Sequence, residues 1–115
     1  MCLDAASKGC DEKGREVLII AGTLEVDPDE RAEFLESQIE GMRRSRDEPG
    51  CLAYVFSADP IDDGRVYLFE RWESKEALAA HIARQQSAPP KASGVRAKSH
   101  EVQQYEIERV GPIGS

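Results

Sequence analysis

The side chains best suited to chemistry in this sequence lie between residues 70 and 81. Glu70 and Trp72 alternate along a predicted strand and share one face of it, and His81 follows on a predicted helix. An imidazole has an ordinary pKa of about 6.5 and can accept a proton from a phenol. A carboxylate on a buried face has a raised pKa and can serve as a base, and an indole can stack on a flat ligand. These residue types therefore predict proton abstraction from an aromatic molecule, with Trp72, His81 and Glu70 as the candidate catalytic residues.

Each of these three side chains also has a purely structural interpretation. Trp72 could close the sheet against a helix, and His81 could be a half-buried, hydrogen-bonded residue without a chemical role. Glu70 would need a positive partner if its face is buried. Because Arg71 points to the opposite face of the strand, we expect another arginine, supplied across a dimer interface, to neutralise Glu70.

Four apolar or aromatic side chains are candidates for the wall of a substrate pocket. They are Tyr54, Phe56, Phe34 and Leu68. Ordinary packing of the sheet and of a dimer interface is the alternative for each of them.

The remaining reactive side chains predict no metal site and no disulfide framework. The two histidines, His81 and His100, are far apart and lack metal-ligand spacing. The three cysteines are an odd number without a CxxC pair. We therefore expect no metal site.

Six regular elements must position the candidate residues. The periodicity and the turn signals predict strands over 17–26, 51–58, 65–72 and 101–110, and helices over 28–46 and 75–86. The order β-α-β-β-α-β predicts a ferredoxin-like α+β fold, a four-stranded antiparallel sheet with both helices on one face. Residues 1–15 are polar and aperiodic and are interpreted as a flexible leader to a single domain over 16–113.

Both faces of the predicted sheet carry large apolar side chains. Leu52, Tyr54 and Phe56 are expected to share one face, while Tyr67 and Phe69 lie opposite Val66, Leu68 and Trp72. Two helices on one face leave the other face without a cover. Pairing of two sheets about a two-fold axis would supply that cover, so we predict a homodimer.

Composition excludes several classes of partner. The chain has 115 residues and a net charge of −7, which disfavours nucleic acid and anionic lipid as partners. No apolar run approaches the ~20 residues that a membrane span requires, and residues 1–15 lack the apolar core of a signal peptide. A cytoplasmic location is the resulting expectation.

Several segments together resemble the antibiotic biosynthesis monooxygenase family. They are DPDERAEF at 27–34, EPGC at 48–51 followed by Tyr54, YLFERWES at 67–74, EALAAHIA at 76–83 and QYEIERV at 104–110. The resemblance implies a dimeric α/β barrel that acts as a cofactor-independent monooxygenase on a quinol, an anthrone or a similar small aromatic molecule. Trp72 and His81 match the tryptophan and histidine of the family, and Glu70 matches a glutamate of its motif.

Two departures from the family keep other functions open. Arg84-Gln85-Gln86 stands where family members often have a Thr-Pro-His segment, and the chain contains no asparagine, which the haem-degrading branch uses with the tryptophan. The alternative is a non-catalytic dimeric module that binds a small ligand. Haem binding through His81 is the less favoured third interpretation.

Overall fold

The computed structural model of the protein describes residues 17–89 and 94–115. Along the chain the elements are β1 (Leu18–Glu25), a 3-10 turn (Pro28–Glu30), α1 (Arg31–Arg46), β2 (Cys51–Ala58), β3 (Arg65–Trp72), α2 (Lys75–Ser87) and β4 (Ser99–Glu106). The predicted order and the ferredoxin-like α+β fold are confirmed. The predicted leader at residues 1–15 lies outside the described residues.

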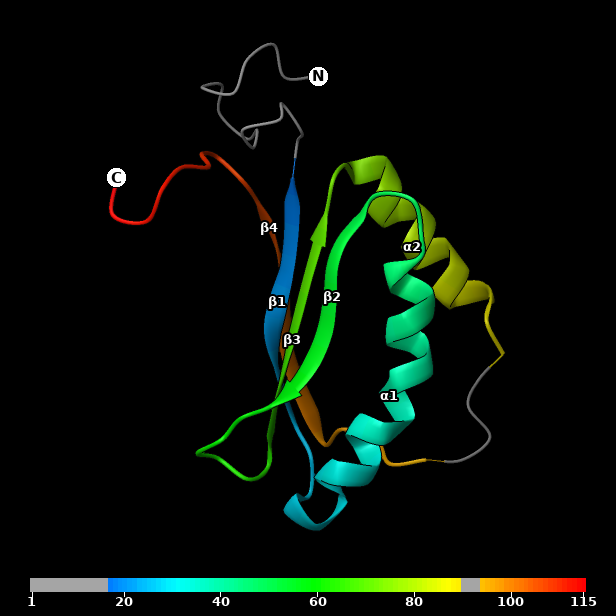
Figure 1. Cartoon of the computed structure of the whole chain (residues 1–115). Helices are drawn as coiled ribbons and strands as arrows, with labels where there is room; N and C mark the ends of the chain where they lie inside the picture. Colours follow the sequence, from blue (N-terminus) through cyan, green and yellow to red (C-terminus); the bar gives the residue numbers. More distant parts are fainter. Residues whose placement is uncertain (1–16, 90–93) are drawn as a thin grey trace.

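The four strands form one antiparallel sheet in the order β2-β3-β1-β4. Figure 1 shows α1 and α2 on the same side of this sheet. The last strand, predicted over 101–110, runs from Ser99 to Glu106. Its bounds follow those of β1, because Ser99 pairs with Glu25 and Glu106 pairs with Leu18, the two terminal residues of β1. The central strand β3 carries both Glu70 and Trp72 on the face that the helices cover.

Side-chain caps start α2 and the 3-10 turn that precedes α1. The Ser74 hydroxyl accepts a hydrogen bond from the Ala77 amide at 3.0 Å and starts α2. The Asp27 carboxylate accepts from the Asp29 amide at 3.2 Å, but the first turn there is a 3-10 turn that leads into α1. The helix predicted over 28–46 therefore begins with a 3-10 turn, and the α-helix itself begins at Arg31.

The core consists of two buried clusters that meet at Phe56. Val26, Phe34 and Val66 form the first cluster, and Tyr54, Trp72 and Leu78 form the second. At the start of α1, Ala32 is exposed and does not reach the core. Phe34, which is 4% exposed, is instead the residue by which the start of α1 is anchored in the core.

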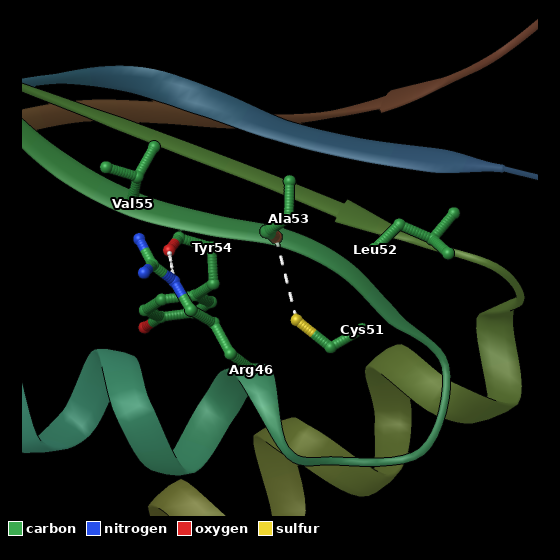
Figure 2. A pocket seen from close by; sticks show the side chains of 6 residues that line it. All are labelled: Arg46, Cys51, Leu52, Ala53, Tyr54 and Val55. Atoms are coloured by element: carbon green, nitrogen blue, oxygen red, sulfur yellow. Dashed lines mark hydrogen bonds between the residues drawn. The ribbon is translucent and has the colours of Figure 1, made fainter.

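A β-bulge near the start of β2 changes which side chains share a face. Cys51 pairs with Trp72 and Ala53 pairs with Arg71, so Leu52 is an extra residue in the strand. Figure 2 shows Cys51 and Tyr54 projecting toward the helices, whereas Leu52 does not. The prediction that Leu52 shares a face with Tyr54 is therefore wrong, because the bulge breaks the period-two alternation.

The face of the sheet opposite the helices is open and carries exposed aromatic rings. Tyr67, Phe69 and Tyr105 are 45%, 37% and 47% exposed, and all three lie on this face by register. The Nε atom of Arg71, on the same face, is buried without a hydrogen-bond partner among the described residues.

Candidate functional site

The most polar buried cluster in the described chain is centred on His81. The side chain of His81 is 3% exposed, and its Nδ1 lies 2.9 Å from Oε1 of Glu48. Arg84, one turn later on α2, donates from Nη1 to the same oxygen at 3.0 Å. A single carboxylate oxygen from the α1–β2 loop therefore joins two side chains of α2.

These contacts determine which nitrogen of His81 carries a hydrogen. Oε1 of Glu48 accepts the hydrogen bond from Arg84, so it acts as an acceptor toward Nδ1 as well. In the neutral imidazole Nδ1 then carries the hydrogen and Nε2 carries the lone pair. Nε2 is buried and has no hydrogen-bond partner among residues 17–89 and 94–115. In the neutral ring this nitrogen is an acceptor that no donor of the described residues reaches.

The loop between α1 and β2 brings Glu48 to this position. Gly50 has a φ of +84°, a conformation that side chains disfavour, and a Cβ there would overlap the Cβ of Ala77 on α2. The Gly50 carbonyl also accepts a hydrogen bond from the Glu73 amide at 2.9 Å. The absence of a side chain at Gly50 thus allows the loop to lie directly against α2, which places Glu48 beside His81.

Aromatic rings enclose the imidazole on two sides. The Trp72 ring centroid lies 4.6 Å from that of His81 with an angle of 35° between the planes. The Tyr54 ring meets His81 nearly edge-on at 5.4 Å. Trp72 is fully buried, so it supports the imidazole from behind and cannot reach a ligand without a rearrangement.

Glu70 is partnered by the indole of Trp72 and by no arginine of the described residues. The Trp72 Nε1–H donates to Oε1 of Glu70 at 2.9 Å, with both side chains buried. The period of the strand places the indole directly beside the carboxylate, and an arginine supplied across a dimer interface stays a prediction. Burial raises the pKa of the Glu70 carboxyl, and the indole hydrogen bond and the nearby His81 oppose the rise only in part.

Tyr54 is held as a neutral phenol. Burial, followed by the nearby negative charge of Glu70, raises the pKa of Tyr54 to about 12, against the opposing effect of hydrogen bonds with Ser45 and Gln85. Tyr54 therefore offers a hydroxyl group and a ring face, and it is not a base at neutral pH.

A cavity of about 480 Å³ lies between α1 and α2 and reaches this cluster. Its lining comprises Ser37, Gln38, Glu40, Gly41, Arg44, Ser45, Glu48, Tyr54, His81, Arg84, Gln85, Ala88 and Pro89. Of the predicted site residues, His81 and Tyr54 line it. Trp72 and Glu70 lie behind them.

The other predicted wall residues belong to the packed interior. Phe34 and Phe56 meet edge to face at 6.1 Å and take part in the core, and Leu68 lies on the sheet beside Phe56 by register. None of the three lines the cavity between the helices. Their role in binding stays a prediction.

Sequence reasoning missed Glu48 and Arg84. Glu48 was named only within the EPGC segment that resembles the family, and Arg84 only as a departure from the family. The available signal was a carboxylate directly before the Pro49-Gly50 turn. Its pairing with a histidine 33 residues away depends on how the loop packs on α2.

A second, shallower hollow of about 420 Å³ lies along the open edge of β2 (Figure 2). Arg46 donates there from Nε to the carbonyl of Tyr54 at 2.8 Å, and the Cys51 thiol contacts the carbonyl of Ala53 at 3.7 Å. Burial, with the charges of Glu48 and Glu70, raises the pKa of the Cys51 thiol, so it is a poor nucleophile.

The described residues offer neither a group of metal ligands nor a helix able to cross a membrane. Among residues 17–89 and 94–115, no three His, Cys, Asp or Glu side chains are grouped closely enough to hold a metal ion. In the same part of the chain, neither helix combines the length and the apolar character that a membrane crossing requires.

Residues 17–88 match the family model described as antibiotic biosynthesis monooxygenase. The chain belongs to this family. The matched stretch spans β1 to α2 and contains the whole His81 cluster. The site therefore lies in the part of this antibiotic biosynthesis monooxygenase domain that matches the family. The match lies inside the domain predicted over 16–113, whose outer limits stay a prediction.

Known relatives of this family member extend the comparison. An uncharacterized protein from Synechocystis is 35% identical over 75 residues, which is 65% of this chain and 48% of that protein. The chain thus spans about half the length of that curated relative.

Two solved structures show the same fold. A candidate antibiotic biosynthesis monooxygenase from Deinococcus radiodurans has a TM-score of 0.64 at 20% identity, over 85% of this chain and 99% of that chain. The heme-degrader MhuD from Mycobacterium tuberculosis, with two hemes bound in its active site, has a TM-score of 0.62 at 23% identity over the same shares. At these identities the likeness establishes the fold and leaves the reaction open.

Proposed function

We propose that this protein is a cofactor-independent monooxygenase that oxidises a small electron-rich aromatic molecule, such as a quinol or an anthrone, with O2. The observation that carries the proposal is His81 on the wall of a cavity, with Nδ1 bound to Glu48 and a buried Nε2 that has no partner in the described chain. Because Nε2 is itself buried, side chains around it must move before the neutral imidazole can act as a general base for an acidic phenol or benzylic C–H.

The proposed reaction balances without a cofactor. Nε2 of His81 removes a proton, and the resulting substrate anion gives one electron to O2. The two radicals combine to form a C–O bond, and the peroxide takes the proton back from His81. Loss of the remaining C–H proton breaks the O–O bond, so that a CH2 group and O2 become a C=O group and water. All four electrons come from the substrate.

The surroundings of His81 support this sequence of steps. Glu48 stabilises the imidazolium while it holds the proton, and Arg84 keeps the carboxylate in place. Stacking against Trp72 fixes the ring orientation. Glu70 acts through Trp72, since its carboxylate accepts the indole hydrogen and does not line the cavity.

Oxygen uptake by the purified protein tests the proposal. The substrates would be a panel of hydroquinones, anthrones and dihydroxynaphthalenes, with the rate of autoxidation subtracted. We expect uptake that His81→Ala abolishes and that His100→Ala, a change of the exposed histidine on β4, leaves intact. Equal rates in the two variants would overturn the role of His81.

A non-catalytic ligand-binding module is the second candidate. The observation in its favour is that Trp72 and Glu70 are shielded from the cavity, so of the three predicted catalytic residues only His81 is among the described residues that line it. Such a module would bind members of the same panel without oxygen uptake. Haem binding through Nε2 predicts a Soret band on titration with haemin, and its absence would exclude that function.

We also propose that the protein is a homodimer that joins the open faces of two sheets. The exposed rings of Tyr67, Phe69 and Tyr105 and the unpartnered Nε of Arg71 support this arrangement, because burial of that face would cover the first three and offer a partner to the fourth. Sedimentation of Phe69→Lys should show monomer. Ile61→Lys, at a 94% exposed position on the β2–β3 turn, should sediment as the wild type does.

A further inference from the structure

A glycine stands in the middle of α1, on the wall of the cavity between the helices. A Cβ at Gly41 would have one atom within 4 Å, the terminal Nη2 of Arg44 at 4.0 Å. Gly41 does not have the positive φ that Gly50 has. Glycine in a helix interior lowers stability relative to alanine. Neither backbone conformation nor close packing within the described chain requires glycine here, so the space that it leaves open needs another explanation.

Some of the charged side chains around that space form ion pairs within the described chain, and one does not. Glu40 accepts from Arg43 at 3.0 Å, and Glu48 accepts from Arg84 beside its contact with His81. In the described part of the chain, Arg44 forms no ion pair. The charge left available on the cavity wall is therefore a guanidinium, which favours an anion over a cation as a ligand group.

The inner end of the cavity is aromatic. Tyr54 and His81 both line it, with their rings 5.4 Å apart. A planar ring is the ligand surface that such groups bind best.

From these observations we infer that Gly41 determines ligand specificity: it leaves room in the α1–α2 cavity for an aromatic ring whose anionic substituent is bound by Arg44. The inference rests on the proposed function for the location of the site and goes beyond it in naming an aromatic carboxylate or similar anion as the ligand class. Gly41 and Arg44 are binding residues in this account and take no part in the chemistry.

Calorimetric titration with two matched probes tests the inference. The probes are naphthalene-2-carboxylate and its neutral counterpart naphthalene-2-carboxamide. We expect the wild-type protein to bind the carboxylate more tightly than the carboxamide. Arg44→Gln should weaken carboxylate binding about twofold to fivefold, the range of an exposed ion pair, and leave carboxamide binding unchanged. Arg109→Gln, which makes the same change in net charge at an exposed position outside the cavity, should leave both affinities unchanged.

Two variants of Gly41 separate the ligand effect from stability. Gly41→Ala should raise Tm by roughly 2–6 °C, because alanine is the better helix former and a Cβ meets open space. Gly41→Leu should reduce the affinity for both probes at least tenfold without a fall in Tm. Glu36→Leu, at an exposed position of α1 outside the cavity, should keep wild-type affinity.

Three results would overturn the inference. They are the absence of probe binding by the wild-type protein, unchanged affinity in a folded Gly41→Leu variant, and a lower Tm in Gly41→Ala, which would show that the space is needed for packing against another molecule. Probe binding without oxygen uptake on any substrate would leave the inference intact and refute the oxygenase proposal. Oxygen uptake on the phenol panel with no probe binding would do the reverse.

Discussion

Replacing Trp72 with phenylalanine removes one defined hydrogen bond from the interior. The indole Nε1–H donates to Oε1 of Glu70 at 2.9 Å, and Trp72 is 0% exposed while Glu70 is 6% exposed. Phenylalanine keeps an aromatic ring against His81 but has no donor. The carboxylate of Glu70 is then left buried without this partner.

The expected loss of stability follows from two effects. A buried hydrogen bond to a charged group contributes about 1.5–3 kcal/mol, and the smaller ring leaves a cavity that costs about 1 kcal/mol. The free energy of unfolding should therefore fall by about 2.5–4 kcal/mol when Glu70 is charged.

The size of the loss should depend on pH. The folded pKa of Glu70 is raised above its usual value of 4.5, so the stability of the wild-type protein falls as pH rises from there through the folded pKa. In the Trp72→Phe variant, which lacks the indole donor, the folded pKa of Glu70 rises further. The pH range over which stability falls therefore becomes wider. The deficit of Trp72→Phe should be smallest in acid, where the carboxyl is protonated in both states, and should grow toward neutral pH.

Urea denaturation followed by far-UV circular dichroism measures this effect. Fluorescence is unsuitable because Trp72 is the single tryptophan of the chain. The double-mutant cycle with Glu70→Gln, at one fixed protein concentration, isolates the interaction free energy between Trp72 and Glu70. When Trp72→Phe is made in the Glu70→Gln variant, the loss should shrink to about 2 kcal/mol and become independent of pH. A loss that is the same at pH 4 and pH 7, or the same with and without Glu70→Gln, would refute this reasoning.

Three further changes have defined expectations. Glu48→Gln should weaken the preference of His81 for the Nδ1–H tautomer, since an amide can donate to Nδ1 where the carboxylate cannot; ¹⁵N NMR of the imidazole nitrogens would reveal it, and an Nε2–H tautomer in the wild-type protein would contradict the assignment of the hydrogen to Nδ1. Ser74→Ala should lower the free energy of unfolding by about 1 kcal/mol through loss of the α2 cap, as urea denaturation would measure, with Ser74→Asp retaining most of it. Gly22→Ala should destabilise the protein by at least about 2 kcal/mol, because its Cβ would overlap the carbonyl oxygen of Glu101 on β4; faster amide exchange across β4 would locate the damage, and wild-type stability would show that the two strands separate at no cost.

Much of the fold was predictable because its determinants are local. The strand over 65–72 follows from period-two alternation, and the start of α2 follows from Ser74 ahead of a helical repeat. Each signal involves residues a few positions apart, so it acts before any tertiary contact forms. The same locality explains why Glu70 and Trp72 could be placed on one face.

The arrangement of the site was decided by tertiary structure. The bond between Glu48 and His81 joins residues 33 positions apart and depends on the close approach that Gly50 allows between the loop and α2. The bulge at Leu52 breaks the alternation that the sequence predicts, because strand register is a property of the paired strand and not of one strand alone. By itself the sequence determined the elements, their order and the residue types available for chemistry. Only packing decided which of those residues meet, since the energy of a buried polar contact depends on neighbours that a linear pattern does not specify.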